Sequence, residues 1–137
     1  MTSSPLYITR PDHHRLRILL SSIHRPAISA TLEKLREELD RATIIDPAAV
    51  PPDTVTMGAR VQFEDLYSGE VEEYTLSFPE HADIGQGRLS ILTPVGTALI
   101  GYRQGNIVEW PTPGGLRRLK IHHVAQPVKA GQPLAAS

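Results

Sequence analysis

Histidine is the residue type in this sequence best suited to metal binding, and it occurs in two adjacent pairs, His13-His14 and His122-His123. Adjacent side chains point about 100° apart on a helix and to opposite faces of a strand, so neither pair can chelate an ion alone. The chain has no cysteine and no His-x-x-x-His spacing, which removes the commonest zinc arrangements. We expect surface histidines, no bound metal and no cofactor; a metal site shared between the two pairs is the remaining alternative.

Two carboxylate pairs, Glu64-Asp65 and Glu72-Glu73, could suggest acid-base catalysis. Such catalysis needs a desolvated cleft that shifts the pKa of a carboxyl group, but alternation places these acids on solvent-facing strand and turn positions. There is no G-x-S-x-G nucleophile elbow, and Gly114-Gly115 precedes a strand-like run rather than the helix that a phosphate loop requires. The sequence therefore predicts no catalytic residue and no small-molecule substrate.

The stretch 89–121 contains the clearest structural pattern. An apolar strand leads into Thr93-Pro94, where threonine suits the N-cap and proline suits the first position of a helix. Two strand-like runs follow, 107–110 and 116–124, separated by a turn rich in proline and glycine. One face of the predicted helix is apolar, because four residues recur at helical spacing, namely Val95, Ala98, Leu99 and Tyr102.

Two further strands are predicted upstream, over 55–64 and 72–78, because apolar and polar residues alternate there. Before them, Thr9 to Asp12 opens the first of two amphipathic segments, and His24-Arg25-Pro26 separates it from the second. This pattern predicts an antiparallel helical hairpin. The pattern alone leaves open whether the two helices pack as ordinary core helices or project as a short arm.

Three segments lack a periodic pattern. We expect 1–8 to be a mobile leader, 44–53, which holds three prolines, to be a linker, and 127–137 to be a disordered tail. No apolar run reaches the roughly 18 residues that a membrane span requires, and no signal-peptide pattern follows Met1. These features predict a cytoplasmic protein without a membrane anchor.

The motif Leu89-Ser90-Ile91-Leu92-Thr93-Pro94-Val95-Gly96-Thr97-Ala98-Leu99-Ile100-Gly101, followed by Pro113-Gly114-Gly115, resembles the C-terminal domain of the Gre-type transcript factors. Two upstream motifs, Val55-Thr56-Met57-Gly58-Ala59-Arg60-Val61 and Leu39-Asp40-Arg41-Ala42, resemble one branch of that superfamily, Rnk, the regulators of nucleoside diphosphate kinase. The similarity covers residues 10–126.

The pattern and the resemblance together imply an α+β fold. Residues 1–45 would form a short antiparallel helical hairpin, a short coiled coil, and the resemblance favours its projecting as an arm. Residues 46–126 would form an FKBP-like twisted antiparallel sheet with one short helix, and 127–137 a disordered tail.

The resemblance also implies a partner, RNA polymerase. Gre-type factors dock their C-terminal domain on the rim of the secondary channel, in the β′ subunit, and hold a catalytic Mg²⁺ with acids at the tip of a long coiled coil. The turn 21–28 of this chain carries no acid, so we expect a non-enzymatic regulator that excludes Gre-type factors by occupying their site. The positions that match the family's dock are Thr93, Pro94, Val95 and Gly96, with Pro113, Gly114 and Gly115 beside them.

Two alternatives come from other classes of protein. An FKBP-like fold could carry prolyl isomerase activity, but alternation assigns Phe63, Phe78 and Tyr74 to the core, which leaves too few aromatics for such a pocket. A weak nucleic-acid-binding module could use a basic strip, defined as Arg117, Arg118, Lys120 and His122. A net charge of −1 argues against binding by bulk electrostatics, and we expect no sequence-specific nucleic-acid partner. The sequence gives no sign of direct contact with the kinase and leaves its existence open.

Overall fold

The computed structural model describes residues 6–112 and 114–127. Most of the predicted leader and tail, and Pro113 of the predicted dock, lie outside these ranges. The α-helices of the described residues are α1 (Arg10–Ser22), α2 (Ser29–Arg41) and α3 (Pro94–Leu99). Their strands are β1 (Tyr7–Thr9), β2 (Thr43–Ile45), β3 (Arg60–Asp65), β4 (Val71–Ser77), β5 (Arg88–Ser90), β6 (Ile107–Thr112) and β7 (Gly115–Ala125). Short 3-10 helices are η1 (Pro26–Ile28), η2 (Pro47–Ala49), η3 (Pro79–His81) and η4 (Ile84–Gln86).

The helical hairpin begins where its cap residue predicts. Thr9 is the N-cap of α1, and its side chain accepts a hydrogen bond from the backbone N–H of Asp12. The Asp12 carboxylate in turn accepts from the backbone N–H of Met57, 3.0 Å away, which ties α1 to the segment that leads into β3. One continuous apolar core contains leucines of both helices together with residues of the sheet and α3.

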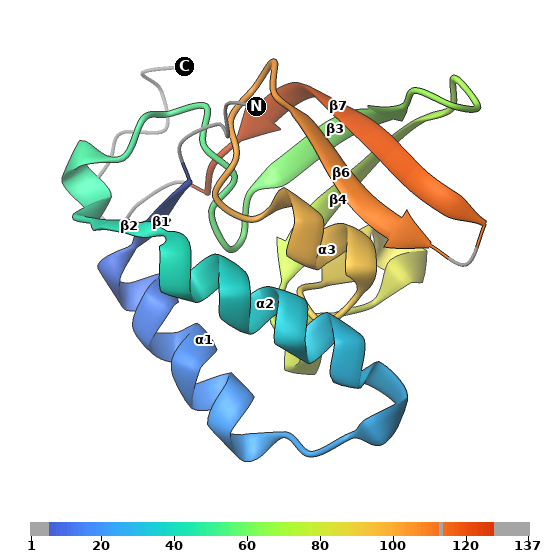
Figure 1. Ribbon diagram of the computed structural model, residues 1–137. Helices are drawn as coiled ribbons and strands as arrows, with labels where there is room; N and C mark the ends of the chain where they lie inside the picture. Colours follow the sequence, from blue (N-terminus) through green and yellow to red (C-terminus); the bar gives the residue numbers. More distant parts are fainter. Residues whose placement is uncertain (1–5, 113, 128–137) are drawn as a thin grey trace.

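The two helices therefore pack against the rest of the molecule as ordinary core helices, which is the first of the two arrangements that the pattern allowed. The structure does not have the projecting arm that the resemblance favoured. Figure 1 shows α3 between α2 and β6, and these elements are in contact. Leu16 of α1 and Leu35 and Leu39 of α2 are fully buried in the common core. A helix that buries a leucine stripe gains most of its stability from that packing rather than from intrinsic propensity.

Two strands replace what the sequence predicts as a leader and a linker. β1 and β2 pair in parallel, with Tyr7 opposite Thr43, and Ile8 is only 1% exposed. The predictions of a mobile leader up to Ile8 and of an irregular linker from Ile44 are therefore wrong for these residues. Strands of three residues are too short to show alternation, and their pairing joins positions far apart in the chain.

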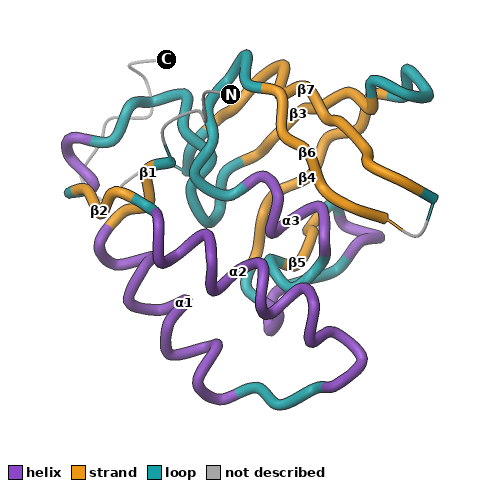
Figure 2. The backbone as a smooth tube through the Cα atoms, viewed as in Figure 1, coloured by secondary structure: helices purple, strands orange, loops and turns teal. Residues whose placement is uncertain are grey.

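The larger sheet has the order β5-β4-β3-β7-β6 and is mixed, which corrects the prediction of a purely antiparallel sheet. The β3–β4, β3–β7 and β6–β7 pairs are antiparallel, whereas β5 runs parallel to β4. Figure 2 shows that the connection between β4 and β5 is not a tight hairpin, and it contains η3 and η4. This crossover allows the chain to return and enter β5 in the same direction.

β3 begins at Arg60, five residues later than the alternation predicts. Gly58 adopts a φ of 84°, a left-handed conformation that interrupts an extended strand. Val55, Met57 and Ala59 are nevertheless buried, as the alternation predicts, but Thr56, which it places on the polar face, is buried as well. No helix in the described part of the chain is long and apolar enough to cross a membrane.

Candidate functional site

The first turn of α3 is held by hydrogen bonds from Thr93. Its hydroxyl accepts from the backbone N–H of Gly96 at 3.0 Å and donates to the carbonyl of Ser90 at 2.7 Å. Pro94 occupies the first helical position, where a missing N–H leaves no bond unmade. The prediction of a capped helix at Thr93-Pro94 is confirmed.

The four predicted docking residues of α3 differ in exposure. Pro94 is exposed, Thr93 and Val95 are half-buried, and Gly96 is buried. A Cβ atom on Gly96 would overlap the carbonyl oxygen of Ser90 and would lie 3.1 Å from the Cα of Ile91. The surface that this helix start offers a partner is therefore formed by Thr93, Pro94 and Val95, while Gly96 allows α3 to approach the end of β5.

The predicted turn residues lie at the far end of the β6–β7 ribbon. Gly114 and Gly115 are exposed, and Gly115 pairs with Thr112 at the end of the ladder. Figure 1 shows that α3 runs beside β6, with this turn beyond it. α3 is in contact with β6, and Gly115 opens β7, the strand that pairs with β6.

A buried carboxylate connects α2 to the segment that follows α3. The side chain of Glu38 is 2% exposed; its carboxylate lies 3.3 Å from Nε of Arg41 and 3.4 Å from Nζ of Lys34. The Arg41 guanidinium also donates to the Tyr102 hydroxyl. Burial raises the pKa of the Tyr102 phenol, and the negative charge of Glu38 raises this pKa further.

Glu38 is not among the residues predicted for a site, although its position in α2 follows a pattern that marks it. Glu38 lies three residues after Leu35 and four before Ala42, so it falls on the apolar stripe of α2 rather than on the charged face. A carboxylate on such a stripe, with Lys34 and Arg41 at helical spacing, is typical of a buried ion pair.

The histidines and acids make contacts with other groups. His13 forms a hydrogen bond with the carbonyl oxygen of Leu39 at 3.0 Å, and His122 lies 2.7 Å from Glu64. In residues 6–112 and 114–127, no three His, Asp or Glu side chains gather closely enough to hold a metal ion.

Three of the four residues of the basic strip are paired with acids. Arg117 pairs with Asp65, Arg118 pairs with Glu109 at 2.9 Å, and His122 lies beside Glu64. Paired guanidinium groups would have to exchange these acids for phosphates, which weakens the case for a nucleic-acid surface. Phe63 and Phe78 are buried and Tyr74 is half-buried against Phe63, which confirms their assignment to the core.

Asp65→Asn is expected to change the pH dependence of stability. The hydrogen bond from Arg117 holds the pKa of the Asp65 carboxyl below its ordinary value of 3.8, and the N–H groups of Tyr67 and Ser68 act in the same direction. Because this pKa is lower in the folded state than in the unfolded state, the ionised Asp65 stabilises the fold above about pH 4. This stabilisation is lost as the pH falls through the folded pKa. Urea unfolding from pH 7 to pH 2 should therefore show the variant less stable at pH 7, with the difference vanishing in acid.

The matched control is Glu80→Gln, an exposed acid on η3. It should follow the wild-type curve at every pH. A difference between Asp65→Asn and wild type that stayed constant from pH 7 to pH 2 would show that the Arg117 pair contributes no charge-dependent stability.

A helical hairpin shares one core with a small mixed sheet, and a threonine-capped helix start lies beside a β-ribbon. This arrangement agrees with the class of proteins that contains the C-terminal part of Gre-type factors. The family model "Transcription elongation factor, GreA/GreB, C-term" matches residues 50–126, and the model "Rnk N-terminus" matches residues 5–45. The chain therefore belongs to the Rnk family of GreA/GreB-related proteins.

Individual relatives agree with this assignment. The "Regulator of nucleoside diphosphate kinase" of Escherichia coli strain K12 is 38% identical over 118 residues, which is 85% of each chain. The "Transcription elongation factor GreA" of Methylococcus capsulatus is 36% identical over 69% of this chain and 60% of its own length. A solved GreA/GreB-type factor from Nitrosomonas europaea superposes with a TM-score of 0.71 at 39% identity, covering 90% of this chain and 99% of its own.

Proposed function

We propose that this protein is a non-enzymatic regulator of transcription that binds RNA polymerase through the start of α3. The observation that carries the proposal is the exposed ring of Pro94 on a helix start that Thr93 fixes by its cap. Half-buried Val95 extends this apolar surface. A rigid, partly apolar helix start of this kind suits contact with another helix, because little conformational freedom is lost on binding.

The proposed binding site on the polymerase is the rim of the secondary channel in the β′ subunit, by analogy with the Gre-type relatives. The protein would then compete with GreA-type factors by occupancy, in the cytoplasm where transcription takes place. The exposed Gly114 and Gly115 would flank the contact. The effect on nucleoside diphosphate kinase implied by the name of the Escherichia coli relative would be indirect, through transcription.

The proposal excludes transcript cleavage and prolyl isomerisation. The turn 21–28 between α1 and α2 carries no acid, whereas Mg²⁺ in a cleavage factor needs carboxylate ligands. We also propose that the chain has two parts. Residues 1–45 would form a short coiled coil, and residues 46–126 would form an FKBP-like domain. Two of the aromatics that could line an isomerase pocket, Phe63 and Phe78, are buried in the core.

The direct test is equilibrium binding of the fluorescently labelled chain to purified core RNA polymerase, with unlabelled GreA as the competitor. We expect saturable binding that GreA displaces completely. Absence of binding, under conditions in which labelled GreA binds, would overturn the proposal. Binding that GreA does not displace would retain the partner and overturn the shared site.

Pro94→Arg is expected to weaken polymerase binding at least about tenfold, which corresponds to about 1.4 kcal/mol. The arginine would place a long charged side chain at the centre of the proposed contact. Its effect on folding should be small, because Pro94 is exposed. The same competition assay measures the change, and urea unfolding checks stability.

The matched control is Ala48→Arg. Ala48 is exposed on η2. Figure 1 shows this segment, in green, on the opposite side of the molecule from the end of β6. This variant adds the same side chain and should bind polymerase like the wild type. Equal affinities for Pro94→Arg and Ala48→Arg would remove α3 from the interface.

A further inference from the structure

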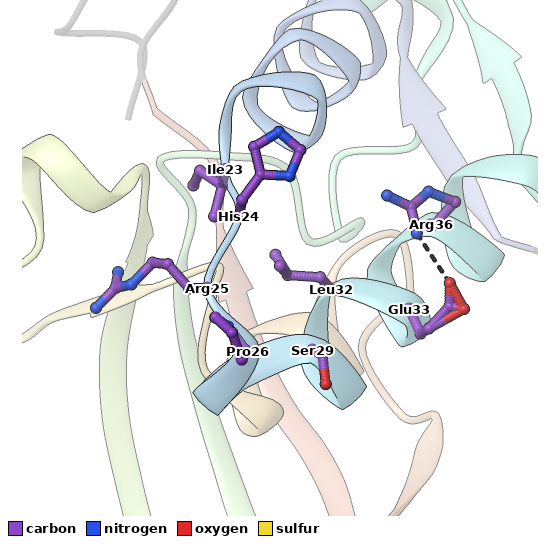
Figure 3. Close-up of a pocket in the computed structure, with 8 residues that line it drawn as sticks. All are labelled: Ile23, His24, Arg25, Pro26, Ser29, Leu32, Glu33 and Arg36. Carbon is purple, nitrogen blue, oxygen red and sulfur yellow. Dashed lines mark hydrogen bonds and ion pairs between the residues drawn. The ribbon is translucent and has the colours of Figure 1, made fainter.

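A hollow of about 450 Å³ opens at the tip of the helical hairpin (Figure 3). Residues of the α1–α2 loop line one side, and the first turns of α2 line the other. Its apolar surface comes from Ile23, Pro26 and Leu32, and Figure 3 shows Leu32 pointing from α2 toward the loop. Leu32 is 8% exposed, so a small part of an otherwise buried leucine remains accessible in the hollow.

Positive charge at this hollow is only partly compensated. Arg36 donates a hydrogen bond to Glu33 at 2.9 Å. Among the described residues, the side chains of His24 and Arg25 form no hydrogen bond or ion pair, and both residues are exposed. Figure 3 shows the Arg25 side chain reaching outward from the loop, away from Arg36, so its guanidinium is available to a partner.

The start of α2 adds to this positive potential. The N-cap residue is Ile28, whose side chain cannot accept a hydrogen bond, and the first turn of the helix contains no acid. The first N–H groups of a helix carry partial positive charge, and natural helices commonly neutralise it with a capping oxygen or an acid. α2 begins without either beside Arg25 and His24, and of its N–H groups that of Ser29 donates to the Pro26 carbonyl of η1.

We propose that this hollow is a docking site for an acidic peptide segment of a partner protein. An aliphatic side chain of the segment would lie on Leu32 and Pro26, and its carboxylates would face Arg25 and the start of α2. Charge complementarity selects an acidic partner, and the apolar floor selects a peptide over a phosphate ion.

RNA is the less suitable ligand. The eight lining residues include no Phe, Tyr or Trp on which a base could stack. The imidazole of His24 is the one ring among them that offers a flat face. The proposal does not require that the partner be RNA polymerase, so it can be tested whether or not the chain binds polymerase.

The test is a titration of the ¹⁵N-labelled full chain, followed by amide chemical shifts. The ligand is a short blocked peptide of Asp, Glu and Leu, and its control is the same peptide with Asn and Gln in place of the acids. We expect shifts centred on residues 23–36 with the acidic peptide, an affinity that falls as salt is added, and much smaller shifts with the amide peptide. Equal shifts with both peptides, shifts centred elsewhere, or no shifts would overturn the proposal.

Arg25→Glu should weaken the acidic peptide at least about tenfold, because it replaces the free guanidinium by a like charge. The matched control is Arg60→Glu, an exposed arginine on β3, which should leave peptide affinity unchanged. Inorganic phosphate and a short single-stranded RNA are titrated in parallel. Equivalent shifts at 23–36 with phosphate would reduce the hollow to a simple anion site, and tighter binding of RNA would replace a protein partner by a nucleic acid; either result overturns the proposal.

Discussion

Glu38→Ala is expected to lower the free energy of unfolding by about 2–3 kcal/mol, the size expected when a buried charged group loses its hydrogen bonds and a small cavity opens. The carboxylate is 2% exposed, whereas Arg41 and Lys34 are 40% and 43% exposed. After the substitution, water can solvate both cations, so no buried charge is left uncompensated. The loss comes from the hydrogen bonds of the carboxylate and from a cavity between α2 and the segment that carries Tyr102.

The neighbouring residue offers a matched control, because Glu37 is exposed on the same helix. Glu37→Ala should stay within about 0.5 kcal/mol of the wild type. Tyr102→Phe removes a hydroxyl next to the same carboxylate and should cost about 1 kcal/mol. Urea unfolding of Glu38→Ala, of Tyr102→Phe and of the double variant gives the coupling free energy between Glu38 and Tyr102. Strict additivity would mean that Glu38 and Tyr102 do not stabilise each other.

Local chemistry explains why parts of the fold could be predicted. Thr9 and Thr93 are both N-caps whose hydrogen bonds reach only three residues along the chain, so the sequence near them contains all the necessary information. β6 and β7 pair directly across a turn rich in proline and glycine, and both strands were predicted. In each case the interacting groups are close in sequence.

The elements that were missed depend on contacts between distant residues. Tyr7 pairs with Thr43, and Thr75 of β4 pairs in parallel with Arg88 of β5. Neither pairing has a hairpin turn that would mark it in the sequence. Short parallel strands acquire their structure from the surrounding fold, and so periodicity could not reveal β1 and β2 or the direction of β5.

The candidate site shows the same division. The position of Thr93 and Pro94 at a helix start follows from residue type alone, and the structure confirms it. The sequence could not show which members of the motif face solvent, because that depends on how α3 sits against β5. Gly96 was grouped with the docking residues, but it is buried against Ser90 and Ile91. Its place in the motif therefore has a packing explanation that does not require a partner.

Gly96→Ala is expected to destabilise the protein by about 3 kcal/mol, against the usual preference of helices for alanine. In a solvated helix, this substitution stabilises by up to about 1 kcal/mol. Here the new Cβ would overlap the carbonyl oxygen of Ser90 and would lie 3.0 Å from Oγ1 of Thr93. Both neighbours belong to the cap that holds α3 on β5, so relief of the clash requires a backbone shift, and overpacking of this kind costs about 1–3 kcal/mol or more.

The same shift would displace Pro94, so Gly96→Ala should weaken polymerase binding even under conditions in which the variant stays folded. Gly85→Ala is the matched control, because its new Cβ would meet only Oδ1 of Asp83 at an ordinary 3.4 Å. We expect its stability to stay within about 0.5 kcal/mol of the wild type and its polymerase binding to be unchanged.

If Gly96→Ala were instead as stable as wild type, α3 would have to lie farther from β5 than the structure places it. If the variant were destabilised but bound polymerase normally, the α3 start would be a structural element only, because an interface that uses Pro94 depends on the position that Gly96 allows.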